Sequence, residues 1–132
     1  MNNIIFRNPQ IKDFKDMLAF NFIIPIKRAL KYKSICSSSY VAELNGKVIG
    51  IIICEKSLLG SYDIKIIEVN PKYRLQGIGK MLINKVKDLA NGKAISVYYP
   101  KDERIENFYK SNDFIIGNNV KVAMFCSEIN NC

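Results

Sequence analysis

Hydrophobic residues follow two different spacings along this chain, and each change of spacing marks the border of an expected element. Residues 40–44 and 47–55 are apolar stretches separated by Asn45-Gly46, the dipeptide most typical of a two-residue hairpin turn. Residues 48–54 are apolar on both faces apart from Gly50, which predicts a strand covered on both sides. We therefore expect a hairpin whose second strand lies in the middle of a sheet.

The stretch from residue 62 to residue 92 predicts a strand, a loop and a helix in succession. Residues 62–69 are rich in β-branched side chains, and Gly77 and Gly79 lie in the loop that follows. Apolar residues then recur at helical spacing until Leu89, and a glycine at position 92 can end the helix. Residues 95–99 predict another strand. Two strands that flank one helix in so short a stretch predict a parallel βαβ unit.

The two ends of the chain complete the expected order of elements. The part before the hairpin predicts, in order, a strand at residues 3–7, a helix that contains Ile11, Phe14 and Leu18, a basic helix at residues 26–31 and a polar loop at residues 34–39. The part after residue 99 predicts a last helix capped by Asp102 and two closing strands at residues 114–116 and 120–126. We therefore expect one domain over residues 1–132, of the α/β class.

Composition and charge narrow the classes of protein that fit this pattern. The formal net charge of +8 favours a polyanionic partner, either nucleic acid or a phosphorylated cofactor, although the same charge could simply keep the protein soluble. The chain has no histidine, and its four cysteines form no C-x-x-C pair, so we expect no metal site. It shows neither a run long enough to span a bilayer nor a signal-peptide pattern, which predicts a soluble cytoplasmic protein without a membrane partner.

The glycine loop at Gly77 and Gly79 is a candidate phosphate site, because a helix that starts there presents unpaired N–H groups and the positive end of its dipole. Two common nucleotide motifs do not fit it. A Walker A loop needs glycine where Arg74 stands and serine or threonine where Met81 stands. A dinucleotide fingerprint needs a third glycine where Leu82 stands. The loop therefore belongs to another class of anion site.

The segment Arg74-Leu75-Gln76-Gly77-Ile78-Gly79 has the form R/Q-x-x-G-x-G/A. It resembles the acyl-CoA pyrophosphate loop of the GCN5-related N-acetyltransferase (GNAT) family, and V-x-P-x-Y-R before it extends the resemblance. IIFRNPQIKDF and VAELNGKVIG are similar to the opening elements and the hairpin of that family, and the expected order of elements resembles its fold from end to end. The resemblance implies a central, mostly antiparallel sheet with one splayed parallel strand pair, flanked by about four helices.

The segment ENFYKSNDF resembles the last-helix signature of the family, with three departures from the usual pattern. Asp102 stands where asparagine is usual, Ile105 where alanine is usual, and Asp113 where glycine is usual. The first change removes an amide donor that could contact the pantetheine arm of the cofactor, because a carboxylate cannot donate. The last change affects a turn that aspartate tolerates.

The resemblance implies that acetyl-CoA binds between the strand ending at Val69 and the strand starting at Ile95, with Asp102 beside the pantetheine arm. It also implies that the N–H of Val69 bonds the acetyl carbonyl. Tyr109 resembles the tyrosine that acts on the sulfur as general acid; the alternative is an aromatic that packs the last helix against the sheet. The residues implied to hold the pyrophosphate are Arg74, Leu75, Gln76, Gly77, Ile78, Gly79 and Lys80.

The absence of histidine leaves carboxylates or water as the base that deprotonates an acceptor amine. Glu68 is the first candidate, since it precedes Val69, but it could also be an outward-facing charge of an alternating strand. Glu43 and Glu55 are reserves. The expected function is transfer of an acetyl group from acetyl-CoA to a primary amine in a ternary complex, by a monomer or homodimer.

Two alternatives to an enzyme follow from the same residues. A degenerate relative could bind acyl-CoA without transferring the acyl group. A small basic nucleic-acid-binding module would explain the charge, but the chain shows no helix-turn-helix or RNA-binding signature. No motif indicates which amine is the acceptor.

Overall fold

A seven-stranded sheet organises the part of the chain that the structure, a computed structural model, describes: residues 3–17, 36–99, 102–117 and 122–126. The strands are β1 (Ile4–Arg7), β2 (Tyr40–Leu44), β3 (Lys47–Lys56), β4 (Tyr62–Val69), β5 (Ile95–Tyr98), β6 (Ile115–Ile116) and β7 (Val122–Phe125). Their order in the sheet is β1-β2-β3-β4-β5-β7-β6. All neighbours are antiparallel except β4 and β5, which are parallel. This confirms the predicted mixed sheet with one parallel pair.

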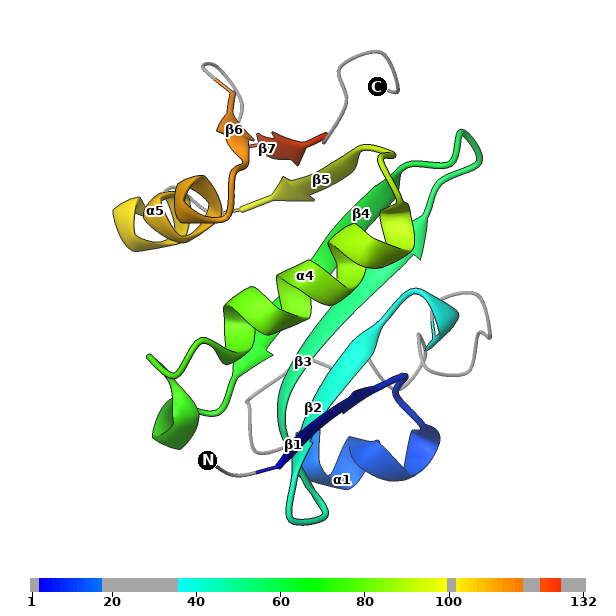
Figure 1. Cartoon of the computed structure of the whole chain (residues 1–132), viewed down its shortest axis with the longest axis vertical. Helices are drawn as coiled ribbons and strands as arrows, with labels where there is room; N and C mark the ends of the chain where they lie inside the picture. The colour runs from blue at the N-terminus through cyan, green and yellow to red at the C-terminus, as the bar shows by residue number, and fades with distance from the viewer. Residues whose placement is uncertain (1–2, 18–35, 100–101, 118–121, 127–132) are drawn as a thin grey trace.

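The helices of the described residues are η1 (Ile11–Asp13), α1 (Phe14–Met17), η3 (Pro71–Tyr73), α4 (Ile78–Ala90) and α5 (Glu103–Ser111). Helix α4 lies across one face of the sheet and packs on β2, β3 and β4 (Figure 1). Helix α5 lies beyond the end of β5 and packs against β6. The basic helix expected at residues 26–31 lies outside the described residues, so the described part has fewer long helices than the four we expected.

Strand β3 is buried on both faces, as the sequence predicts, and lies in the middle of the sheet. Its side chains Ile49 and Ile52 belong to the core under α4. Its side chains Val48, Ile51 and Ile53 form a second apolar cluster with Val41 of β2. Helix α4 therefore covers only one of the two faces that this strand buries.

The polar loop expected at residues 34–39 is wrong in part: of its described residues, Ser38 and Ser39 are turn and coil, but the segment is neither wholly loop nor solvated. Cys36 and Ser37 are helical, and Ser38 and Ser39 are buried. The Ser38 hydroxyl donates to the Cys54 carbonyl over 2.6 Å, and the Ser39 hydroxyl accepts from the Cys54 N–H over 3.0 Å. These serines look like loop residues in sequence, but their short hydroxyls satisfy the buried backbone of β3.

Asp13 ties the first helical turn to the sheet. Its carboxylate accepts two hydrogen bonds from the Arg7 guanidinium, at 2.7 and 2.9 Å, and one from the Gln10 N–H at 2.7 Å. Arg7 also donates to Glu43 of β2 over 2.9 Å. Burial alone would raise the pKa of Asp13, but the hydrogen bonds from Arg7 and Gln10 outweigh burial and hold this pKa below its ordinary value.

We expect Asp13→Asn to lower the free energy of unfolding by about 2 kcal/mol at neutral pH, because the Arg7 guanidinium loses its buried anionic partner. The sign of the pH dependence follows from the lowered pKa: the stabilisation is present above the ordinary pKa of aspartate and is lost as pH falls through the folded-state value. Urea unfolding at neutral and acidic pH measures both effects. A difference between native protein and variant that stays constant down to low pH would contradict this assignment.

Candidate functional site

Strands β4 and β5 run side by side for only part of their length and then separate. Their parallel pairing covers residues 62–64 of β4 and 95–97 of β5, although β4 continues to Val69. At the paired end, the hydroxyl of Ser96 donates to the carboxylate of Asp63 across the two strands. The strands are thus fastened at one end and open at the other (Figure 1).

A β-bulge explains where the separation begins. Ile64 pairs with Cys54 and Ile66 pairs with Ile53, so Lys65 is an extra residue in β4. A bulge bends its strand and increases the local twist. Because this bulge follows the last residue that pairs with β5, it turns the rest of β4 away from its parallel neighbour.

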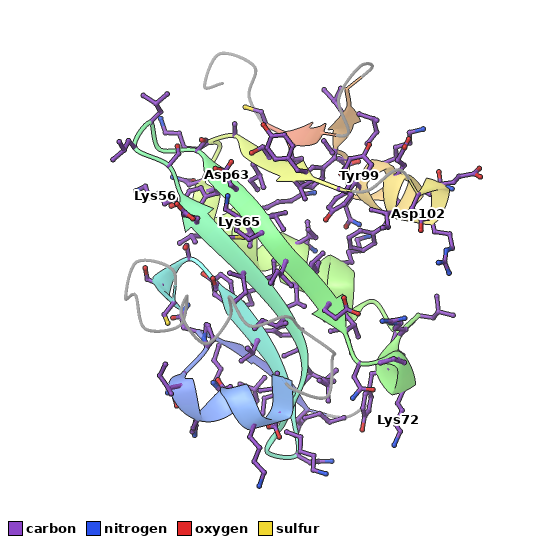
Figure 2. The ribbon with its side chains drawn as sticks, turned by 180° about the vertical axis from the view of Figure 1, so that it is seen from behind. Lys56, Asp63, Lys65, Lys72, Tyr99 and Asp102 are labelled. Carbon is purple, nitrogen blue, oxygen red and sulfur yellow. The ribbon has the colours of Figure 1, made fainter. Side chains whose placement is uncertain are left out.

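A cleft of about 910 Å³ opens between the separated strands. The second half of β4 and the first turn of α4 form one wall, and the end of β5 with α5 forms the other. Figure 2 shows Tyr99 and Asp102 on the α5 side, and Lys72 of η3 beyond the far end of β4. The predicted site residues that line the cleft are Glu68, Val69, Arg74, Leu75, Gly77, Ile78, Gly79, Lys80, Asp102 and Tyr109.

Three residues considered at the sequence level lie outside the lining of this cleft. Gln76 is exposed and does not line the cleft, although its neighbours on both sides do. Glu43 of β2 accepts a hydrogen bond from Arg7 of β1, and Glu55 is exposed near the end of β3. Neither reserve carboxylate therefore lies where a reacting group in the cleft would be.

The register of β3 and β4 shows which backbone groups of β4 face the cleft. The Asn70 N–H donates to the Ile49 carbonyl over 2.8 Å, next to the pair of Gly50 with Val69. Hydrogen-bonded and non-hydrogen-bonded pairs alternate along an antiparallel ladder, so Val69 and Ile67 both belong to non-hydrogen-bonded pairs with β3. Their N–H and C=O groups therefore point away from β3, toward the gap left by β5.

The N-terminus of α4 presents N–H groups that have no acceptor within the helix. Its first backbone bond runs from the Met81 N–H to the Gly77 carbonyl over 3.0 Å, so the N–H groups of residues 78–80 are left over. Within the described residues, no side chain caps this helix, and its first turn contains Lys80 but no acidic residue. By contrast, Asp102 caps α5. The positive end of the α4 dipole is therefore available to an anion in the cleft.

The two glycines of the loop are required for different physical reasons. Gly77 has a φ of +79°, in the left-handed region, and a Cβ added there would meet nothing within 4 Å. At Gly79 an added Cβ would lie 3.2 Å from two ring carbons of Phe108. Gly77 therefore serves the turn into α4, while Gly79 permits the close approach of α5.

The Arg74 side chain turns back toward the end of β4 instead of lying over the helix N-terminus. Its Nε donates to the Val69 carbonyl over 3.0 Å, and its terminal nitrogen donates to Glu68 Oε1 over 2.7 Å. The side chains of Arg74 and Glu68 are 53% and 33% exposed. Exposed ion pairs of this kind contribute less than about 1 kcal/mol, so the pair can open at low cost when another anion approaches.

Tyr109 lies on the inner wall of the cleft, in a cluster of aromatic rings. Its ring centroid is 5.7 Å from that of Tyr99, 5.2 Å from that of Phe114 and 5.3 Å from that of Phe108. Burial, followed by the nearby Cys54 and Tyr99, raises the pKa of Tyr109 well above its ordinary value. The hydroxyl therefore stays protonated at every pH at which the protein would normally be assayed.

Sequence reasoning missed several residues that line the cleft. Tyr99 and Phe108 could have been found, since one directly precedes Pro100 and the other adjoins Tyr109. Ile67 has a backbone role that no side chain reveals. Asn112 carries no signal beyond its place at the end of α5.

A sequence profile described as Acetyltransferase (GNAT) domain matches residues 36–116, more than half of the chain. The chain belongs to the GNAT family of acetyltransferases. The matched range contains the cleft, the R-x-x-G-x-G loop and Tyr109. A comparison of this GNAT protein with curated protein sequences finds no match.

Solved structures share the fold over almost the whole length of this GNAT protein. A GNAT-family acetyltransferase from Staphylococcus aureus is 17% identical, with a TM-score of 0.78 over 96% of this chain and 100% of the other. The PaiA N-acetyltransferase from Thermoplasma acidophilum, in complex with coenzyme A, is 14% identical, with a TM-score of 0.69 over 92% and 97%. Naa50 from Arabidopsis thaliana, in complex with the bisubstrate analogue CoA-Ac-MVNAL, is 21% identical, with a TM-score of 0.71 over 92% and 97%.

Two further findings concern the described part of this GNAT protein. No helix there is both long and apolar enough to cross a bilayer. The same residues contain no group of three or more His, Cys, Asp or Glu side chains that could hold a metal ion.

Proposed function

We propose that this protein is an N-acetyltransferase that moves an acetyl group from acetyl-CoA to a primary amine by direct transfer in a ternary complex, with residues 1–132 acting as one domain. The observation that carries the proposal is the cleft between β4 and β5, which leads from inward-facing backbone N–H groups to an uncapped helix N-terminus. An extended ligand with a carbonyl at one end and phosphates farther along matches both features. Relatives of known fold with bound coenzyme A or a coenzyme A analogue support the choice of donor.

The residues of the cleft fit the two charged or polar parts of such a donor. The N–H groups of residues 78–80 and the ammonium of Lys80 would hold the pyrophosphate, and Arg74 would add charge after leaving Glu68. The N–H groups of Val69 and Ile67 face the gap, and either can donate to the acetyl carbonyl as negative charge develops there. One donor of this kind is worth about 3 kcal/mol in a transition state.

Glu68 would take the proton of the acceptor amine, directly or through one water. Its side chain is one-third exposed at the end of β4. It is next to Val69, whose N–H is a proposed donor to the acetyl carbonyl. Arg74 already occupies Oε1, so Oε2 is the oxygen that would accept the proton. Binding of the donor phosphates would draw Arg74 away and free both oxygens.

Tyr109 would stabilise the leaving sulfur. A thiol has an ordinary pKa of about 8.5, and burial places the pKa of Tyr109 far above this value. Complete proton transfer from the phenol to a thiolate is therefore uphill. We propose that the hydroxyl donates a charge-assisted hydrogen bond to the thiolate as the carbon–sulfur bond breaks, which lowers the barrier without a free tyrosinate.

A binding measurement and a turnover measurement together test the function. Calorimetry with acetyl-CoA asks whether the cleft takes the donor, and release of free CoA thiol across a panel of primary amines asks whether transfer occurs. Binding with turnover of at least one amine supports the enzyme. Binding without turnover across a broad panel supports the degenerate acyl-CoA-binding alternative, and absence of binding overturns the proposal.

We expect Glu68→Gln to lower kcat/KM at neutral pH and to recover part of the loss as pH rises. An ammonium with a pKa of about 10.4 is almost wholly protonated at neutral pH, so a base matters most there and less once free amine is present. The measurement is kcat/KM from neutral pH to about pH 10 for an accepted amine.

Glu55→Gln is the matched control for this prediction. It removes an exposed strand carboxylate that does not line the cleft, so its profile should follow that of the native protein. If the Glu68→Gln profile does the same, Glu68 is only an exposed strand residue, and the proton leaves by another route.

A further inference from the structure

The cleft between β4 and β5 opens on both faces of the sheet. Side chains alternate along a strand, so the neighbours of a core residue point to the opposite face. Ile67 and Val97 pack into the core under α4. Their neighbours Glu68 and Tyr98 therefore point away from α4, and both also line the cleft. The cleft thus has a second opening, here called the far mouth, on the face of the sheet that α4 does not cover.

Lys65 belongs to the far mouth as well. It follows Ile64, a core residue under α4, and precedes Ile66, which belongs to the second apolar cluster on the other face. As the extra residue of the β-bulge, Lys65 has no partner on β3, and it lies where β4 leaves β5. Its side chain is exposed and lines the cleft, and Figure 2 labels it on β4, seen from the far face. The bulge therefore places an ammonium group at the far mouth.

The charged groups at the far mouth differ in whether they already have a partner. Glu68 accepts a hydrogen bond from Arg74, and the nearby Asp63 accepts one from the Ser96 hydroxyl. By contrast, Lys65 forms no hydrogen bond or ion pair among the described residues. Its ammonium is therefore available to an anionic group of a ligand.

The donor phosphates have their own cationic site and do not need Lys65. That site is the N-terminus of α4, which follows the end of β4 and whose first turn carries Lys80. Lys65 precedes Val69 by four positions, on the order of 10 Å along the strand, and points to the other face. Because α4 covers the near face, an acceptor amine reaches the cleft through the far mouth. Lys65 therefore faces the acceptor.

Tyr98 adds an aromatic surface to the same mouth. Its surface is 75% exposed, although it lines the cleft. An aromatic ring offers a large contact area at a low cost in conformational entropy, which suits it to hold the body of a ligand. The far mouth thus combines the carboxylate of Glu68, the ring of Tyr98 and the ammonium of Lys65.

We propose that the acceptor of this protein is a primary amine that also carries an anionic group, a carboxylate or a phosphate, and that Lys65 binds this group at the far mouth. The inference rests on the proposed function, because it names the class of acceptor that the same cleft takes. The amine lies beside Glu68 and the anion beside Lys65, and the body between them contacts Tyr98. Amines without an anionic group leave Lys65 unused and are poorer acceptors.

Matched pairs of acceptors test the proposal through the ratio of their kcat/KM values. Phenylalanine and phenethylamine share an aromatic ring and differ by the carboxylate, and O-phosphoethanolamine and ethanolamine differ by the phosphate. The native protein should prefer the anionic member of at least one pair by about tenfold, the typical effect of one charge-assisted hydrogen bond. The pair that shows the preference identifies the anion that Lys65 binds.

Variants of Lys65 assign the preference to its ammonium. Lys65→Gln should abolish the preference, and Lys65→Glu should invert it, because a carboxylate repels the anion. Since each ratio compares two acceptors of one variant, a loss of stability or of donor binding cancels. The native preference should also shrink in about 0.5 M salt, which screens exposed charges.

Lys56→Gln is the matched control. Lys56 is an exposed lysine at the end of β3 that lies over the Tyr62 ring, outside the lining of the cleft. This variant loses the same charge as Lys65→Gln, so an effect of net charge alone would appear in both. Its preference within each pair should equal that of the native protein.

The outcomes separate this inference from the proposed function. Native protein that acetylates amines without preferring the anionic member of either pair overturns the role of Lys65 and leaves the proposed transferase in place. A Lys65→Glu variant that keeps the native preference does the same. Native protein that acetylates no amine of these pairs or of a broader panel overturns the proposed function, and the inference with it.

Discussion

Gly77→Asp is expected to weaken acetyl-CoA binding by about 100-fold or more while leaving the protein folded. A side chain at this position enters open space in front of the α4 N-terminus, where the phosphates would bind. A carboxylate about 5 Å from one phosphate charge is repelled by about 3 kcal/mol at an effective dielectric constant of about 20. In the free protein the same carboxylate is favourable, because anions stabilise helix N-termini. Because the φ of +79° strains any side chain at this position, the melting temperature should fall slightly, whereas the affinity in calorimetry should fall strongly.

Gly77→Asn is the matched control for the charge. Asparagine has the size of aspartate and tolerates a positive φ about as well, so it carries the same steric and backbone cost. The difference in affinity between the two variants isolates electrostatic repulsion. Equal affinity of the Asp and Asn variants would show that the loop holds no phosphate. Gly79 is unsuited to this test, because a side chain there displaces Phe108.

The fold could be predicted wherever one local pattern determined the structure. Asn45-Gly46 set the hairpin, the two-sided apolar run set β3 as a central strand, and the helical spacing after Gly77 set α4. The polar loop predicted at residues 34–39 was right only in part: Cys36 and Ser37 are helical, and the hydroxyl groups of Ser38 and Ser39 serve a buried backbone instead of a solvated loop. Composition does not distinguish these two uses of serine.

The chemistry of the site could be predicted only in part, because much of it depends on backbone direction and tertiary contact. The R-x-x-G-x-G loop borders the cleft, but its Arg74 binds Glu68 and the Val69 carbonyl, a contact that no spacing reveals. Ile67 became a candidate donor only through the register with β3. Leu75 has a φ of +64°, and this left-handed backbone conformation costs a non-glycine residue about 1–2 kcal/mol. Its side chain is fully exposed.

Tyr109→Phe is expected to lower kcat by about 100-fold with little change in the affinity for acetyl-CoA. The substitution removes only the hydroxyl, and the ring contacts with Tyr99, Phe108 and Phe114 can remain. Loss of a charge-assisted hydrogen bond that forms only as the thiolate leaves raises the barrier without changing ground-state binding. Steady-state kinetics, together with calorimetry on the same variant, separates the two effects.

Two controls make this prediction specific to the Tyr109 hydroxyl. Tyr40→Phe removes a phenol hydroxyl on β2, outside the cleft lining, and should leave kcat unchanged. Burial raises the pKa of Tyr109 above its ordinary value of about 10, so the protonated phenol persists past that pH, and kcat of the native protein should not decline through ionisation of Tyr109 up to about pH 10. A Tyr109→Phe variant with near-native turnover would leave Tyr109 as an aromatic that packs α5 against the sheet, and the leaving thiolate would then be stabilised by water or by the backbone.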